Sequence, residues 1–288
     1  MHPMHSRFAR AFAALVLVVL FGCSNDATSP SNNKSSAKAP TLPSASTMAL
    51  DFDFPAEDQA SVPEEEIRAG IPGAATLASN AERNHWINAL VRAAYVALIT
   101  YDHLEEPVAA SALAIHSVPQ LQDDGSYLWT YIFVDHKTDI EYQIFLYGLE
   151  GNASVMWRLE VSSNDPAQTL DHFVWFAGES AQDEHSGYWQ FYMPVDASNG
   201  TETARIDWLK QSGEQRLTIT VNGAGLPNEG DVLDFHRTTE QSTIEYTRTG
   251  IASNITWFPD GSGSLQVPDY NNGEKACWDT RQRDVACE

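Results

Sequence analysis

The chain has 288 residues, of which 17 are basic and 39 are acidic, and its formal net charge is −22 at pH 7. A protein this acidic is repelled by phosphate backbones and anionic lipid head groups, and no basic cluster in the sequence offsets the repulsion. The composition therefore argues against nucleic acid as a partner and against direct electrostatic adhesion to a membrane surface.

The N-terminal residues have the pattern of a secretory signal. Arg7 and Arg10 precede an uninterrupted apolar run at residues 11–21, which ends just before a glycine and Cys23. A basic segment, a short apolar core and a small residue are typical of a cleaved export signal. A transmembrane helix needs about 20 apolar residues, so this run is too short to be one. We therefore predict that residues 1–22 are a signal peptide.

A family resemblance lies at the end of this signal. Leu20-Phe21-Gly22-Cys23 resembles the lipobox of bacterial lipoproteins, in which a small residue precedes the cysteine that becomes the lipid-bearing N-terminus. The resemblance covers only residues 1–24 and implies acylation of Cys23. It also implies sorting to the outer membrane, because Ser24 rather than Asp follows the cysteine. Several acyl chains anchor a protein stably without a spanning helix. The alternative is cleavage nearby by an ordinary signal peptidase, which would leave Cys23 free.

The following region divides into a tether and the start of a domain. Residues 23–48 are rich in Ser, Asn, Pro, Thr, Ala and Lys and have no apolar period, which predicts a flexible tether. Residues 49–78 are acidic and contain three prolines, which prevent a long helix. We interpret them as irregular structure at the start of a single globular domain that spans residues 49–288.

The sequence then predicts one main amphipathic helix at residues 80–103. Ser79 and Glu82 have the spacing of a capping box, and apolar residues recur every four positions from Trp86 onward. Such a stripe is typical of a helix that buries one side. We expect residues 105–107, Glu-Glu-Pro, to end the helix, and we expect the helix to cover the middle strands of a sheet.

From residue 126 the apolar period changes to two, and turn residues separate short apolar segments. This pattern predicts a mostly β or α+β fold, with a large antiparallel meander of about ten strands over residues 126–267, as a curved sheet or a sandwich. The predicted strands are residues 126–134, 139–147, 153–161, 171–178, 187–194, 203–209, 215–222, 231–237, 242–249, 252–258 and 263–267.

Two of these strands are apolar on both faces. In residues 127–134, four aromatic side chains alternate with Leu128, Ile132 and Val134, and in residues 188–193 tyrosines alternate with other apolar side chains. A strand that is apolar on both faces must be covered on both. We therefore expect neither face of these two strands to meet solvent.

The aromatic residues of the strands are the main candidates for a ligand site. They have two interpretations: they line a cleft for an apolar or amphiphilic ligand, or they pack in the core of the sheet, where aromatic residues are common. The candidate ligand-binding residues are Trp129, Tyr131, Trp157, Trp175, Trp189 and Trp208.

Two cysteines remain once Cys23 is assigned to the lipobox. Cys277 and Cys287 are ten positions apart near the C-terminus. In an oxidising exported compartment, such a pair predicts a disulfide, which would close a loop within residues 268–288. Neither cysteine has a His or Cys neighbour at ligand spacing, which argues against a zinc site.

The sequence contains no recognisable catalytic, cofactor or metal motif. The nucleophile elbow, the Walker loop, the dinucleotide-binding glycines and the zinc-protease pattern are all missing. Residues 269–274 depart from the EF-hand pattern at the third ligand and lack its final glutamate. We therefore expect no cofactor, no metal and no catalytic residue.

Three hypotheses follow for the function. The first is a non-enzymatic, lipid-anchored envelope protein whose aromatic-rich sheet and helix bind an apolar or amphiphilic ligand, which requires a cavity. The alternative is a cell-surface interaction module that binds protein or polysaccharide, which requires an exposed apolar patch and no cavity. A hydrolase is the third, and it requires carboxylates, or a histidine and a carboxylate, that converge in one cleft.

Overall fold

The computed structural model describes residues 38–48, 83–101, 104–135, 138–226, 228–248 and 251–288. The predicted signal peptide, the lipobox with Cys23, the irregular segment 49–78 and the predicted capping box lie outside the described residues. Among the described helices, none is both long enough and apolar enough to cross a membrane.

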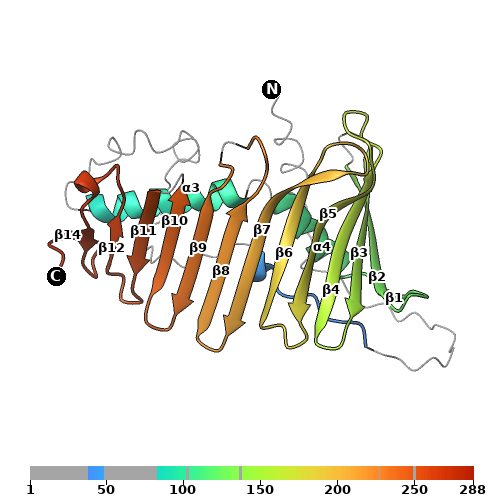
Figure 1. Cartoon of the computed structure of the whole chain (residues 1–288), viewed down its shortest axis with the longest axis horizontal. Helices are drawn as coiled ribbons and strands as arrows, with labels where there is room; N and C mark the ends of the chain where they lie inside the picture. The colour runs from blue at the N-terminus through green and yellow to red at the C-terminus, as the bar shows by residue number, and fades with distance from the viewer. Residues whose placement is uncertain (1–37, 49–82, 102–103, 136–137, 227, 249–250) are drawn as a thin grey trace.

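One continuous sheet dominates the structure (Figure 1). Its fourteen strands pair with their neighbours in chain order, and every pair is antiparallel. The strands are β1 (Gln120–Leu121), β2 (Tyr127–Asp135), β3 (Ile140–Glu150), β4 (Ser154–Ser163), β5 (Leu170–Ala181), β6 (Ser186–Pro194), β7 (Gly200–Gln211), β8 (Glu214–Val221), β9 (Val232–Thr238), β10 (Ser242–Arg248), β11 (Ile251–Trp257), β12 (Gly263–Gln266), β13 (Ala276–Trp278) and β14 (Asp284–Val285). The predicted meander is confirmed as a curved sheet rather than a sandwich. The eleven predicted segments correspond to β2–β12, and the short strands β1, β13 and β14 bring the number to fourteen.

Short turns keep consecutive strands adjacent and so produce the meander order. Gly213, between β7 and β8, has a φ of +79°, which glycine adopts without strain. Between β1 and β2, the carboxylate of Asp124 accepts hydrogen bonds from the backbone N–H and the hydroxyl of Ser126, at 2.9 and 2.7 Å. These bonds lower the pKa of Asp124. Asp260 and Ser262 repeat the arrangement between β11 and β12.

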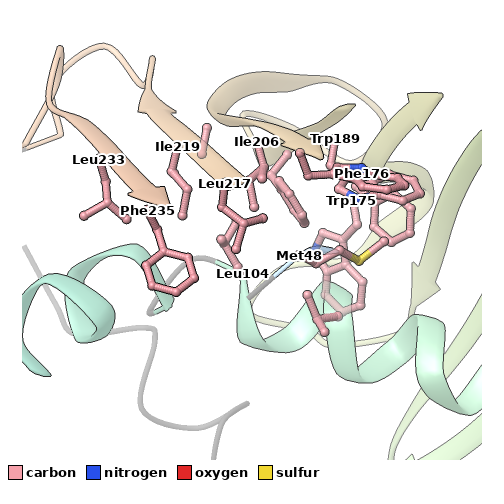
Figure 2. Packing of buried hydrophobic residues seen from close by; sticks show 14 of the residues in the cluster. Met48, Leu104, Trp175, Phe176, Trp189, Ile206, Leu217, Ile219, Leu233 and Phe235 are labelled. Carbon is pink, nitrogen blue, oxygen red and sulfur yellow. The ribbon is translucent and has the colours of Figure 1, made fainter. Parts of the chain in front are cut away.

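The sheet has an inner face, which the helices cover, and an outer face on the other side. Alternate residues of each strand belong to each face. The inner face supplies most of the hydrophobic core, part of which Figure 2 shows. Buried inner-face side chains include Trp129, Ile144, Trp157, Phe176, Trp189, Ile206, Leu217, Phe235, Ile244, Trp257, Leu265 and Trp278.

Two helices lie behind the sheet in the described residues, α3 (Asn84–Tyr101) and α4 (Glu105–Ala114) (Figure 1). The first confirms the predicted main helix. The expectation that it covers the middle strands holds only in part, because α3 packs most closely on β12, β13 and β14 and runs on behind the strands toward β8, while α4 packs on β2 and β3 (Figure 1). Residues 105–107 were expected only to end a helix, but they also begin α4. Pro107 fits there because the first turn of a helix needs no backbone N–H donor.

Residues 38–48 pack against the middle of the sheet. They include the short helix η1 (Ala45–Thr47), which lies beside β7. The indole N–H of Trp189 donates to Thr47 Oγ1 at 3.1 Å, and Met48 is buried near Trp175 and Phe176 (Figure 2). The prediction of a flexible tether over residues 23–48 is therefore wrong for residues 38–48. The sequence did not reveal this packing, because an irregular segment contacts the core through single side chains and therefore shows no apolar period.

The C-terminal residues form the last two strands of the sheet and bind the start of α3. The predicted disulfide is confirmed: Cys277 in β13 is bonded to Cys287, which follows β14, and their Cα atoms are 5.3 Å apart. Asp284 in β14 accepts the backbone N–H of His85 at 2.8 Å. About two turns further along α3, the buried guanidinium of Arg92 donates to Asp269 at 2.9 Å.

Candidate functional site

The six predicted aromatic residues lie in or against the hydrophobic core. The five tryptophans are at most 6% exposed, and Tyr131 is partly buried against the core. Their rings contact one another, as Trp129 and Trp157 do with centroids 6.0 Å apart. The indole N–H of Trp157 donates to Ser180 Oγ at 3.0 Å, so even this polar atom is satisfied internally. The positions of these side chains agree with the interpretation as packed core.

The outer face over β2–β6 is the unusual surface of the molecule. Ile132 on β2 is 56% exposed and Met156 on β4 is 52% exposed, and both described helices lie on the opposite side of the sheet. The expectation that β2 is covered on both faces is therefore wrong. We call this surface, together with Arg205 on the adjacent strand β7, the outer patch. It comprises Ile132, Phe145, Tyr147, Met156, Arg158, Glu160, His172, Tyr188 and Arg205.

Cross-strand pairing places cations against aromatic rings in the outer patch. Tyr147 on β3 is directly opposite Arg158 on β4, and the guanidinium carbon lies 4.7 Å from the tyrosine ring centroid. On β6 and β7, Arg205 lies 4.1 Å from the ring centroid of Tyr188. Contacts of this kind combine electrostatic attraction with burial of the arginine stem. Burial chiefly, and Glu160 secondarily, raise the pKa of Tyr147.

Glu160 organises the centre of the outer patch. Its Oε1 atom forms an ion pair with Arg158 Nε, and its Oε2 atom accepts a hydrogen bond from His172 Nδ1, both at 2.9 Å. The imidazole also stacks on Phe145, with ring centroids 4.6 Å apart, and the backbone N–H of His172 donates to Ser162 Oγ at 2.9 Å. The imidazole is thus fixed by a carboxylate and an aromatic ring, and its backbone by a hydroxyl.

The backbone at His172 is itself unusual. Its φ is +48°, a left-handed conformation that costs about 1–3 kcal/mol for a residue other than glycine. The pairing between β4 and β5 shifts register at two places, one of them between Val161 and Ser163, directly beside this residue. Such irregularities re-aim side chains. Here the shift brings the imidazole over the outer face, within hydrogen-bonding distance of Glu160.

The charges of this cluster lie at different depths. The side chain of Glu160 is 10% exposed, whereas those of Arg158 and His172 are 51% and 53% exposed. The Glu160 carboxylate therefore lies beneath a guanidinium and an imidazole that are both exposed to solvent. Arg205 has a different environment, because Asp207 binds it through both carboxylate oxygens at 2.8 and 2.7 Å. That hydrogen bonding raises the pKa of Arg205.

The outer face over β8–β11 is an ordinary solvent face. Its side chains include Thr218, Thr220, Thr243, Thr247 and Thr256, which alternate with buried inner residues. Arg216 pairs with Asp234 and His236 with Glu214 on the same surface. A half-buried antiparallel sheet normally shows this division between apolar and polar faces.

Neither metals nor family relationships add a second candidate. Within the residues that the structure describes, no three His, Cys, Asp or Glu side chains gather as a metal site requires. No protein-family model matches this chain. No curated protein matches its sequence either. The outer patch is therefore the candidate functional site.

None of the residues of the outer patch was predicted as a site residue. The signal was nevertheless in the sequence, because residues 127–134 and 188–193 are apolar on both faces. We interpreted that pattern as burial on both sides. An uncovered binding face produces the same pattern, and only the position of the helices distinguishes the two.

Proposed function

We propose that this protein is a non-enzymatic, lipid-anchored envelope protein that binds another protein through the outer patch. The observation that carries the proposal is the contrast between the faces of β2–β6. The inner face is packed, whereas the outer face exposes Ile132 and Met156 beside aromatic and arginine side chains. Apolar, aromatic and arginine side chains grouped on one uncovered face are typical of an interaction site.

The composition of the outer patch favours a protein partner. Protein interfaces are enriched in tyrosine, phenylalanine, methionine and arginine, and they are depleted in lysine. The outer patch contains all four enriched types and no lysine. Its cross-strand contacts also hold the long arginine side chains in place, which reduces the entropy that binding would cost.

The other two ligands that we considered fit less well. Sugars stack on open aromatic faces, but Arg158 covers one face of Tyr147, Arg205 covers one face of Tyr188, and His172 covers one face of Phe145. A small apolar ligand would need access to the inner aromatic residues, whose tryptophans are at most 6% exposed. Both observations favour a protein over a polysaccharide or an amphiphile.

Anchoring at the membrane is the second part of the proposal, and it rests on the lipobox resemblance. Acylation of Cys23 would place the sheet domain at the outer membrane and restrict it to partners there. Mass spectrometry of the mature N-terminus, with Cys23→Ser as the comparison, tests this part. We expect an acylated N-terminal cysteine, and an unmodified N-terminus at another residue would contradict it.

Photo-crosslinking in intact cells tests the binding function. A photoreactive amino acid replaces Ile132 or Met156 in the outer patch, or Thr243 or Thr256 on the threonine-rich part of the same face. We expect a discrete protein adduct from the first two positions and none from the second two. Equal crosslinking at all four positions, or adducts that glycosidases rather than proteases remove, would contradict a protein partner.

A further inference from the structure

Around Glu160 in the outer patch, the polar groups exposed to solvent are the guanidinium of Arg158 and the imidazole of His172. The carboxylate is 10% exposed, and each of its oxygens already has a partner, Arg158 in an ion pair and His172 in a hydrogen bond. Arg158 and His172 are about half exposed and lie side by side, because they bind the two oxygens of the same carboxylate. An incoming group therefore meets a guanidinium and an imidazole before it meets the glutamate.

Two similar pairs on the same face have more accessible carboxylates, with Asp234 27% and Glu214 41% exposed against 10% for Glu160. His236 Nε2 donates to Glu214 Oε1 at 3.0 Å, and the two side chains are 40% and 41% exposed. Arg216 binds Asp234 through both carboxylate oxygens, so its Nε and one terminal nitrogen are both used. An incoming group there meets both signs of charge. These pairs are natural controls for Arg158 and His172.

The hydrogen-bond direction at His172 gives its free nitrogen a defined chemistry. A carboxylate only accepts, so Nδ1 is the donor in the bond to Glu160. In the neutral imidazole Nε2 is then an acceptor, and in the imidazolium it becomes a donor. The titratable and charged groups around the imidazole are Glu160 and Arg158 on β4, Tyr147 on β3, Asp171 on its own strand, and Asp196 in the loop that hydrogen-bonds Asp171.

We propose that Arg158 and His172 form a carboxylate-binding site that recognises an acidic side chain of the protein partner. The proposal deepens the protein-binding function above and rests on it. Arginine binds carboxylates through charge-assisted hydrogen bonds. Glu160 lies beneath Arg158 and His172 and holds both donors in position at the surface. Phe145 and Tyr147 supply aromatic surfaces against which the imidazole and the guanidinium are held in place.

Binding of a labelled, N-acetylated hexaglutamate peptide to the full-length chain in detergent tests the site. We expect Arg158→Gln and His172→Gln each to weaken binding about tenfold, the loss typical of one charge-assisted hydrogen bond. Arg216→Gln and His236→Gln should leave it unchanged. Arg158→Lys, with a native unfolding transition, should retain part of the affinity.

Several outcomes would overturn the site. Equal losses in all four glutamine variants would indicate general electrostatics, and a peptide that does not bind would remove the site altogether. An oligogalacturonate of equal charge that binds more tightly, with the same dependence on Arg158 and His172, would assign the site to a polysaccharide. Failure here is distinguishable from failure of the proposed function, because crosslinking at Ile132 and Met156 does not depend on a carboxylate ligand.

Discussion

The inner and outer faces of the sheet come from alternating residues of the same strands, yet their surroundings are opposite. On β6, Trp189 and Phe191 are fully buried on the inner face, whereas Tyr188 and Tyr192 on the outer face are only partly buried. Both sets are aromatic. Aromatic content therefore does not identify the core of this protein. The elements that lie over a face decide whether its rings are packing residues or contact residues.

The sharpest test of this contrast is a matched pair of substitutions on β6. Trp189→Ala removes a ring that is 0% exposed and that hydrogen-bonds Thr47, so we expect a loss of about 3–5 kcal/mol in unfolding free energy. Tyr188→Ala removes a partly exposed ring next to it and should cost clearly less. Urea denaturation of both variants measures the difference. Equal losses would mean that the two faces are packed alike.

The second test concerns the contacts that hold α3 on the inner face of the sheet. The disulfide closes a ten-residue separation around β14, whose Asp284 binds the start of α3. Replacing both Cys277 and Cys287 by serine should lower the unfolding free energy by about 2–3 kcal/mol through loop entropy. Hydrogen exchange at the first turns of α3 should rise in the same variant, and exchange in β4 should not. A uniform rise in both would show that β14 does not hold the helix specifically.

A third test uses a polar pair on the inner face. The Tyr246 hydroxyl donates to Asp231, which is buried, and burial together with this bond raises the pKa of Tyr246. Tyr246→Phe leaves the buried carboxylate without this donor and should cost about 1–2 kcal/mol.

The sign of the pH dependence at Tyr246 follows from the raised pKa. The fold favours the neutral phenol, so its contribution is complete below the pKa of an unfolded tyrosine, about 10, and is lost as pH rises through the higher folded pKa. Native and Tyr246→Phe proteins should therefore converge in stability in strong alkali. A constant difference across that range would show that the phenol does not titrate with unfolding.

The sequence predicted the strands well because each has a period of two and a turn residue at its end. It predicted α3 and the disulfide for the same reason, since both depend on local spacing. The segment 38–48 and α4 were missed, because an irregular packing segment has no period and a proline can begin a helix as well as end one. The cluster at His172 depends on pairing between three strands and a register shift, which no local pattern records.

The smallest expected effect tests whether the outer patch is truly uncovered. Ile132→Thr and Met156→Thr replace exposed apolar side chains with a residue that strands accept, so each should change the unfolding free energy by less than about 0.5 kcal/mol. The same substitution at Ile144, which is 0% exposed on the inner face of β3, should cost several times more. In the combined outer variant, crosslinking from a probe at the neighbouring Leu128 should fall sharply while stability holds. A large loss of stability at Ile132 would instead mean that this face is packed within the molecule, and the protein-binding function would lose its main support.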